Sequence, residues 1–424
     1  MRTSYLSNLW ANRIGGASFG EKTTLYKFEK IKRAQQEARQ QHPDKVLIDM
    51  GVGEPDQGTL PEMAGLLGWA AAESNNWGYA DNGGMHFRGA VAQYMKRLFG
   101  VHLDPETEIM HSIGSKAALS LLPLCFINPG DIALMTVPGY PVLGTHVRYL
   151  DGEVYALPLR KEEGFLPDLE AIPEAILKAS KLLVLNYPNN PTGATASRAF
   201  YEQVVAFAKK HKLIVVQDAA YAALTFDEAP TSILQVPGGR DVAVELHSLS
   251  KSFNMTGWRI GWICGNSEII EAYAAVKSNM DSGQFLAIQE AAAYALGKPE
   301  FTENLCAKYR RRMKVLVEIL NGVGLDVEPS AGTFFLYVKA PQSVAYQGLE
   351  IVFENAEVFS QWLIREHLIS TVPWDDVDAY VRFSLTFDAP TEEDERKLFK
   401  VFAQRLEECR FNVGSVVNNS GITL

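Results

Sequence analysis

The sequence predicts an α/β fold: a large domain with a mostly parallel central sheet flanked by helices, and a smaller α+β domain. Between residues 46 and 300, short apolar runs alternate with helical patterns. Parallel strands joined by crossover helices produce this alternation. After residue 301 a long helical segment leads to isolated strands and helices. A chain of 424 residues is long enough for two or three such domains.

Composition excludes several classes of protein. Charged residues make up 21% of the chain and hydrophobic residues 47%, which argues against a disordered or fibrous protein. The net charge of -10 argues against a nucleic-acid partner. Four scattered cysteines without a CxxC pair predict no disulfide framework and no metal site. Residues 1–12 lack an apolar signal segment, and the longest nearly apolar stretch, 117–127, is too short to span a bilayer. We therefore expect a cytoplasmic protein without a membrane partner.

The apolar runs and helical patterns place the expected elements. Strands are predicted at Val46–Met50, Glu108–Ser112, Ile132–Val137, Leu182–Leu185, Leu213–Val216, Val242–Leu246, Arg259–Cys264, Thr333–Val338 and Tyr380–Thr386. Helices are predicted at Tyr26–Arg39, Ser115–Phe126, Phe301–Leu320, Ala356–His367 and Thr391–Glu408. We expect residues 1–50 to join the small domain, 51–300 to form the large domain, 301–410 to form the small domain, and 411–424 to be a loosely held tail.

Polar residues stand where the predicted strands end, and ligands of open α/β sheets bind beyond the carboxyl ends of strands. Asp218 follows the run at 212–217, and Tyr221 comes three residues later. An isolated Asp there is more often a helix N-cap, and Tyr221 could be a core aromatic. Lys251, in the segment Ser248-Leu-Ser250-Lys251, follows the next strand, with Arg259 eight residues on.

These residues together fit one ligand. A lone lysine is usually a solvated surface residue, but a lysine of lowered pKa can form a Schiff base with an aldehyde. Ser248 and Arg259 offer donors suited to a phosphate. An aldehyde and a phosphate on one ligand suggest pyridoxal phosphate, and Asp218 could keep its pyridine nitrogen protonated.

Three further segments suit the same cofactor, although each alone is weak. Gly114-Ser115-Lys116 would place free N–H groups at a helix start, a phosphate cradle if it is more than an ordinary turn. Tyr140 follows a strand in a Pro-Gly turn and could stack on a ring. Asn190 lies in a loop stiffened by two X-Pro bonds, which can aim its amide.

In this order the motifs resemble the class I/II aminotransferases, the fold-type I pyridoxal-phosphate enzymes, over residues 20 to 410. The most specific pieces are Asn190-Pro-Thr-Gly193, Asp218-Ala-Ala-Tyr221 and Ser248-Leu-Ser-Lys251 with Arg259. The resemblance implies that Lys251 holds the cofactor and moves the proton at the substrate α-carbon. It assigns the remaining cofactor contacts to Tyr79 (from the second subunit of a homodimer), Gly114, Ser115, Lys116, Tyr140, Asn190, Asp218, Tyr221, Ser248, Ser250 and Arg259.

The resemblance also implies the substrate class, a pair of small amino and 2-oxo acids. Arg382 would bind the α-carboxylate, with Gly53 letting the backbone approach closely and Asn190 nearby; its alternative is an exposed strand arginine. The chain is most similar to the LL-diaminopimelate aminotransferase group of lysine biosynthesis, where Tyr26 and Lys116 match substrate-contacting positions. It has Asn82 and Leu286 where that group carries a glutamate and an asparagine for distal-substrate recognition.

The leading hypothesis is therefore a pyridoxal-phosphate-dependent aminotransferase, with diaminopimelate and glutamate as a candidate pair. A second hypothesis is an alanine- or aspartate-type or broad-specificity aminotransferase, or another pyridoxal-phosphate enzyme acting on amino acids. A third is a non-catalytic module that senses pyridoxal phosphate. Retention of both Lys251 and Arg382 and the absence of a basic segment argue against the third.

Overall fold

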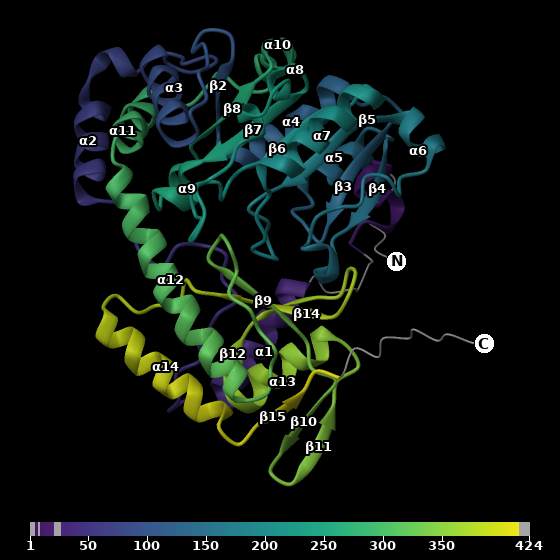
Figure 1. Ribbon diagram of the computed structural model, residues 1–424. Coiled ribbons are helices and arrows are strands. Elements are labelled where there is room, and N and C mark those ends of the chain that lie inside the picture. The colour runs from purple at the N-terminus through teal and green to yellow at the C-terminus, as the bar shows by residue number, and fades with distance from the viewer. Residues whose placement is uncertain (1–4, 7–8, 21–26, 415–424) are drawn as a thin grey trace. The chain divides into compact units, whose positions relative to one another are not determined.

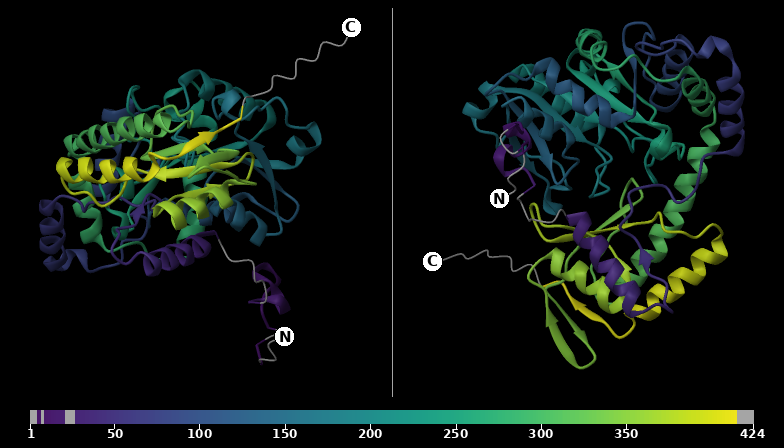
Figure 2. Two further views of the ribbon diagram at one scale, coloured as in Figure 1. Left: turned by 90° about the horizontal axis from the view of Figure 1, so that it is seen from below. Right: turned by 180° about the vertical axis from the view of Figure 1, so that it is seen from behind.

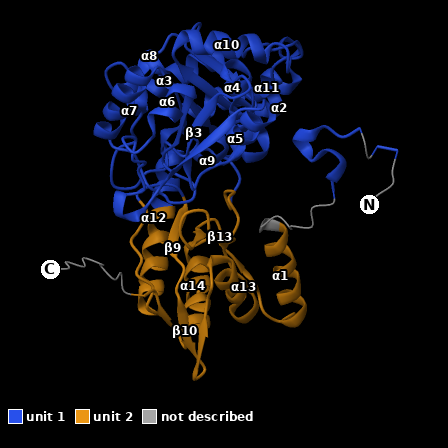
Figure 3. Ribbon diagram, turned by 90° about the vertical axis from the view of Figure 1, so that its right-hand side faces the viewer, with its two compact units in different colours: residues 1–26, 57–308, 331–333 blue, residues 27–56, 309–330, 334–424 orange. Residues whose placement is uncertain are grey.

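The computed structural model describes residues 5–6, 9–20 and 27–414. The chain forms two compact units (Figure 3). Unit 1 consists of residues 57–308 and 331–333 with the described part of 1–26, and unit 2 of residues 27–56, 309–330 and 334–414 among those described. Within the described ranges, no helix combines the length and the apolar composition needed to cross a membrane.

Unit 1 is built on a seven-stranded sheet that confirms the predicted, mostly parallel core (Figure 1). The strand order is β2-β8-β7-β6-β5-β3-β4. β7, β6, β5, β3 and β4 run parallel, and β8 is antiparallel to both of its neighbours. The strands are β2 (Ile109–Ser112), β3 (Ile132–Val137), β4 (Glu153–Pro158), β5 (Ser180–Asn186), β6 (Ile214–Asp218), β7 (Ala243–Ser248) and β8 (Gly261–Gly265).

Helices cover both faces of this sheet, so its central strands are buried on two sides. Two apolar clusters result. One includes residues of α4 (Ser115–Phe126), α5 (Val142–Tyr149) and α10 (Ser267–Lys277). The other includes residues of α3 (Met85–Phe99), α7 (Arg198–His211) and α11 (Leu286–Leu296), and α2 (Pro61–Ala72) packs against α11. Three short helices complete the unit: α6 (Glu174–Ala179), α8 (Gly239–Val242) and α9 (Leu249–Ser252).

Unit 2 is the α+β unit. Its sheets are small: a parallel pair β1-β12, an antiparallel β13-β14-β9 and an antiparallel β11-β10-β15. The strands are β1 (Ile48–Asp49), β9 (Phe335–Lys339), β10 (Ser343–Tyr346), β11 (Leu349–Val352), β12 (Ile369–Ser370), β13 (Val372–Trp374), β14 (Tyr380–Ser384) and β15 (Arg410–Asn412). The helices are α1 (Lys27–Gln41), α13 (Ala356–His367), α14 (Glu392–Leu406) and the part of α12 (Pro299–Gly322) from residue 309 on.

β1, within the predicted run Val46–Met50, pairs with β12 of unit 2 and not with a strand of the large sheet. One expectation needs correction. The tail was expected to be loosely held from residue 411. Instead Phe411 is 7% exposed and lies in β15, which pairs with β10, so its aromatic ring is part of the packing. Residues 415–424 lie outside the described residues.

A buried arginine joins the elements of unit 2. Arg312, on α12, is fully buried and donates to Glu395 of α14 at 2.8 Å and to Asp56 at 3.1 Å. Its guanidinium also donates to the carbonyls of Leu385 and Ala389 at 2.6 and 2.9 Å. The part of α12 in unit 2 and α14 therefore lie side by side (Figures 1 and 2). Both acidic partners are also buried, so the arginine offsets part of the cost of desolvating them; Glu395 is also paired with Arg311 at 2.9 Å.

We expect Arg312→Met to lower the free energy of unfolding of unit 2 by about 3–5 kcal/mol, because it removes the buried cation that Asp56 and Glu395 share, and Arg311 can compensate Glu395 alone. Denaturant unfolding followed by circular dichroism measures the change. The matched control is Arg396→Met on α14, whose arginine is 72% exposed and 3.9 Å from Glu392. That variant should change stability by less than about 1 kcal/mol. Equal losses in both variants would contradict the assigned role.

Candidate active site

The carboxyl ends of β5, β6 and β7 bring the predicted cofactor residues of unit 1 to one edge of the sheet. Asn186 ends β5 and is in register with Asp218, which ends β6. The Asn186 side chain donates to the Asp218 carbonyl at 2.9 Å, and its oxygen accepts from the Asn190 backbone N–H at 3.0 Å. One amide thus ties the Asn190 loop to the start of the Asp218 loop. Sequence reasoning did not single out Asn186.

Asp218 is a buried carboxylate that pairs with no cation among the described residues. Its side chain accepts a hydrogen bond from the Ala220 N–H at 3.3 Å, and the residue is 5% exposed. Burial raises its pKa from 3.8 to about 6, and none of the forces acting on it among the described residues comes from a neighbouring cation. A buried acid in this state favours a positively charged partner, as the protonated nitrogen of a pyridine ring would be.

The Asn190 loop is held by its own side chains. Asn189 is fully buried, and its oxygen accepts from the Thr192 backbone N–H at 3.0 Å and from its hydroxyl at 2.9 Å. The peptide bonds before Pro188 and Pro191 are cis. Asn190 is therefore fixed at half-buried depth beside the end of β5. Tyr221 is 5% exposed, and Tyr140, in the turn after β3, is 37% exposed.

Lys251 lies on the single-turn helix α9, which begins directly after β7. Ser248 caps this helix, because its hydroxyl accepts from the Ser250 N–H at 3.1 Å. Ser248 and Ser250 are buried and Lys251 is half-buried. The strand end and the cap together fix the backbone that carries the lysine at the same edge as Asp218.

The loop before α4 and the loop before β8 lie against each other. No side chain caps the N-terminus of α4, and Gly114 before it has φ +73°. A Cβ atom on Gly114 would lie only 2.6 Å from Arg259 Nη2, so the guanidinium lies directly over this backbone. Arg259 itself has φ +56° and donates from Nη1 to the Thr256 carbonyl at 2.8 Å. Uncapped helix N–H groups beside a guanidinium suit a phosphate. Ser115 is half-buried and Lys116 is exposed.

The predicted carboxylate site lies in unit 2. Arg382, in the middle of β14, is 4% exposed, donates to the Gly51 carbonyl at 3.1 Å and lies over the Phe335 ring at 4.0 Å. We expected Gly53 to permit a close backbone approach. A Cβ on Gly53 would lie 3.7 Å from both Arg382 and Phe335, which is ordinary contact, so the protein alone does not require glycine there.

Two further residues were predicted from the sequence. Tyr26 lies outside the described residues. Tyr79 is 86% exposed in the segment between the short helix at 74–76 and α3. Its exposure fits a residue that acts on another chain, and it equally fits a surface side chain.

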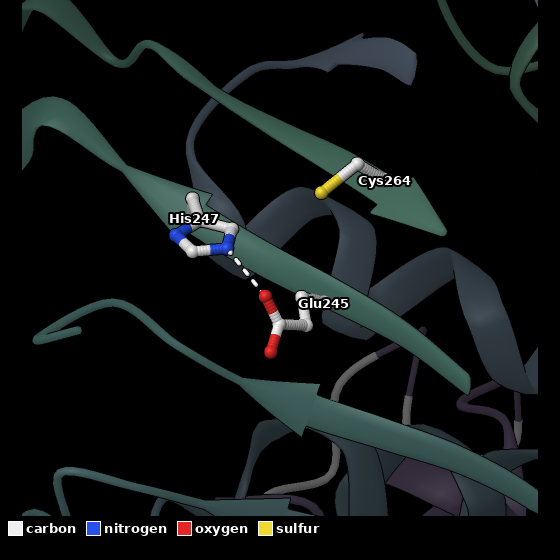
Figure 4. Close-up of side chains that lie close together, drawn as sticks. All are labelled: Glu245, His247 and Cys264. Atoms are coloured by element: carbon white, nitrogen blue, oxygen red, sulfur yellow. Dashed lines mark hydrogen bonds and ion pairs between the residues drawn. The ribbon is translucent and has the colours of Figure 1, made fainter. Parts of the chain in front are cut away.

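A buried polar cluster of Glu245, His247 and Cys264 lies on the neighbouring strands β7 and β8 (Figure 4). His247 Nε2 is 3.0 Å from Glu245 Oε2, and the other carboxylate oxygen accepts from the Ile233 N–H at 2.8 Å. The His247 ring stacks on Trp262 with centroids 4.9 Å apart, and Cys264 lies nearby. Glu245 is satisfied by these bonds, so hydrogen bonding within the protein explains the cluster. The signal for this cluster in the sequence is Glu245 inside the predicted strand Val242–Leu246 and His247 directly after it.

One edge of the unit 1 sheet therefore brings together a lysine, a buried carboxylate and the predicted phosphate cradle, which consists of the start of α4 and the Arg259 guanidinium. These groups fit an aromatic aldehyde that carries a phosphate and a protonatable ring. These features define the class of pyridoxal-phosphate enzymes. The family model for aminotransferase class I and II matches residues 45–400. The chain belongs to this family and is a pyridoxal-phosphate-dependent aminotransferase.

Individual relatives agree. The chain is 54% identical to LL-diaminopimelate aminotransferase of Methanocaldococcus jannaschii, over 95% of this chain and 98% of the relative. It is 42% identical to the enzyme of the same name from Aquifex aeolicus, over 87% and 93%. Among solved structures, substrate-bound BacF from Bacillus subtilis matches with a TM-score of 0.83 at 33% identity, covering 96% of this chain and 99% of that one. A Thermus thermophilus aspartate aminotransferase double mutant matches with 0.80 at 28%, covering 94% and 99%. These comparisons confirm the predicted fold type, enzyme class and cofactor.

The raised pKa of Asp218 predicts a pH dependence in the cofactor-free protein. Between pH 3.8 and about 6 the folded protein binds more protons at this residue than the unfolded chain does, so the folded state loses stability as pH rises through that window. Asp218→Asn removes the titrating group. Relative to wild type, the variant should therefore gain stability from pH 4 to 6, by about 3 kcal/mol at most, and the difference should be constant above pH 7.

Urea unfolding of both cofactor-free proteins between pH 4 and 8 measures this difference. A stability difference that does not vary with pH would show that the Asp218 pKa is not raised.

Proposed function

We propose that the protein is an LL-diaminopimelate aminotransferase, which moves an amino group between LL-diaminopimelate and 2-oxoglutarate, as lysine biosynthesis requires. The observation that carries this assignment is the 54% identity to an enzyme of that name over nearly the whole length of both chains. The relative from Aquifex aeolicus, at 42% identity, bears the same name.

The predicted unit 1 residues contact different parts of the cofactor. When bound, the cofactor supplies an aldehyde that takes up the amino group and a ring that withdraws electrons from the substrate carbon. Lys251 holds the cofactor through Nζ, and the same atom moves the proton at the substrate α-carbon. Asp218 keeps the ring nitrogen protonated, because a cation beside it offsets the free-energy cost of burying the carboxylate charge. Asn190 and Tyr221 donate to the phenolic oxygen, and Tyr140 stacks on the ring.

The phosphate is held by the cradle. The backbone N–H groups of Ser115 and Lys116 donate to it at the uncapped start of α4, and Gly114 leaves room for the Arg259 guanidinium. The hydroxyls of Ser248 and Ser250 add hydrogen bonds. In unit 2, Arg382 binds the α-carboxylate of the substrate, with Gly53 beside it. Tyr26, Lys116 and Asn190 are the further substrate contacts.

A direct assay tests the substrate. The holoenzyme with LL-diaminopimelate and 2-oxoglutarate should form glutamate at least tenfold faster, judged by kcat/KM, than with alanine or aspartate as donor, a difference of about 1.4 kcal/mol in transition-state binding. Lys251→Ala, which lacks the amine, should abolish turnover with every donor. A rate with aspartate or alanine equal to that with diaminopimelate would contradict this specificity but leave the enzyme class intact.

An aspartate- or alanine-type or broad-specificity aminotransferase is the second candidate. It is favoured by Asn82 and Leu286, which differ from the distal-recognition residues of the diaminopimelate group. The same assay separates the two candidates. Only the diaminopimelate enzyme is expected to prefer a donor that carries a second α-amino acid group at its far end.

We further propose that the enzyme is a cytoplasmic homodimer with shared active sites. Large aromatic side chains are exposed on neighbouring elements of unit 1. They are Trp69 on α2, Trp77 and Tyr79 after α2, Phe285 directly before α11, and Tyr294 on α11. Exposed aromatic residues on adjoining elements support a protein interface. In the dimer, Tyr79 reaches the phosphate of the other subunit.

A hybrid dimer tests the shared site. Tyr79→Ala and Lys251→Ala chains are each expected to be nearly inactive, because one loses a phosphate contact and the other the catalytic amine. A hybrid of the two contains one site with both defects and one with neither. Co-refolding should restore up to half of the wild-type activity per dimer. Hybrids that form, as shown by differential tags, yet stay as inactive as their parents would show that Tyr79 serves its own subunit.

A further inference from the structure

Arg259 reaches the cradle from a backbone conformation that arginine rarely adopts. It follows the short helix at 256–258 with φ +56° and ψ +50°, in the left-handed region. In this conformation its guanidinium lies over Gly114, where a Cβ would be 2.6 Å from Nη2. A strained conformation of this kind persists when its surroundings hold it, so the groups that hold it control the cradle.

Gln284 holds both sides of this strained residue. Its amide nitrogen donates to the carbonyls of Trp258 and Arg259, each at 2.9 Å. Both amide hydrogens are therefore used on two consecutive carbonyls. The Gln284 oxygen then faces His111 Nε2 at 2.8 Å. The opposite placement of the amide would set its oxygen against two carbonyl oxygens, which the hydrogen-bond network excludes.

His111 completes the connection from the other side of the cradle. Because the Gln284 oxygen can only accept, His111 must donate from Nε2. The residue is fully buried, and burial lowers the pKa of its ring to about 4, so it is neutral with its one proton on Nε2. His111 lies on β2, three residues before Gly114 and the start of α4.

Further hydrogen bonds and contacts hold Gln284 and His111 in place. The Gln284 carbonyl accepts from the Gln289 amide at 2.8 Å, and the Gln289 oxygen accepts from the Gly84 N–H at 2.9 Å. The His111 backbone N–H donates to the Asn82 carbonyl at 3.3 Å. A Cβ on Gly83 would lie 2.5 Å from His111 Cβ, so the segment packs tightly against the ring.

We propose that Gln284 and His111 are positioning residues for the cofactor phosphate. They join the Arg259 loop to the β2–α4 loop, and they act through Arg259 without touching the cofactor. This inference rests on the proposed role of Arg259 in the phosphate cradle. It predicts that their loss weakens binding of the phosphate and leaves binding of the pyridine ring and aldehyde unchanged.

The test compares two ligands on the cofactor-free protein: pyridoxal phosphate, and pyridoxal, which lacks the phosphate. Dissociation constants are measured by absorbance or fluorescence titration. Gln284→Met should raise the constant for pyridoxal phosphate roughly tenfold more than that for pyridoxal, since it removes two part-buried hydrogen bonds to the Arg259 loop. The matched control is Gln235→Met. Its amide also bonds backbone groups, at Phe99 and Ser232, and it should alter the two constants equally or not at all.

Further variants separate the possible failures. If Arg259→Gln leaves the ratio of the two constants unchanged, the proposed phosphate cradle is wrong. If Arg259→Gln changes the ratio and Gln284→Met does not, the cradle stands and the positioning role is refuted. Should Gln284→Met not fold, His111→Leu should change the ratio, while His111→Gln, which keeps a donor near Nε2, should restore it. Identical ratios for the two His111 variants would overturn the proposal.

Discussion

The hydrogen bonds of the Asn186 side chain set the geometry on which the candidate site depends. Parallel strands end at one edge of a sheet, but their loops then leave independently. Asn186 removes that freedom, because its amide donates to the Asp218 carbonyl and accepts from the Asn190 N–H. The register of β5 and β6 pairs Asn186 with Asp218, so the bond forms only when the sheet is correctly assembled. The packing of the sheet therefore also fixes the positions of Asp218 and Asn190, the predicted ring-binding residues.

The protein treats buried charge in two different ways. In unit 2, Arg312 meets two buried carboxylates and three backbone carbonyls, so its charge is compensated within the chain. In unit 1, Asp218 is equally buried, and among the described residues its carboxylate accepts a hydrogen bond from one backbone N–H and pairs with no cation. The first arrangement stabilises a fold by itself, and the second costs stability until a cation arrives. That difference distinguishes a structural charge cluster from a ligand site.

Local signals explain which elements could be predicted from the sequence. Ile132–Val137, Ser115–Phe126 and Ala356–His367 were predicted with the observed bounds, because Pro138, Gly114 and the capping Asn355 mark their ends. The partner of β1 could not be predicted, since Ile48 and Asp49 carry no information about β12. Candidate cofactor residues could be proposed because each stands at a strand end or in a recognisable motif. Asn186, His111 and Gln284 were missed because they act through hydrogen bonds between segments far apart in the sequence.

The arrangement around Arg259 shows why such residues escape sequence reasoning. Glycine at position 259 would adopt φ +56° with little strain, but it would supply no guanidinium. The chain keeps the arginine, and the strain is offset by Gln284, which lies 25 residues further along the chain. Gly114 takes the complementary part: it has the positive φ and lacks the Cβ that would collide with Arg259. In the proposed cradle, Arg259 thus supplies the positive charge and Gly114 supplies the space and the backbone conformation. Because the two residues lie in separate loops, neither one indicates the other until the fold is known.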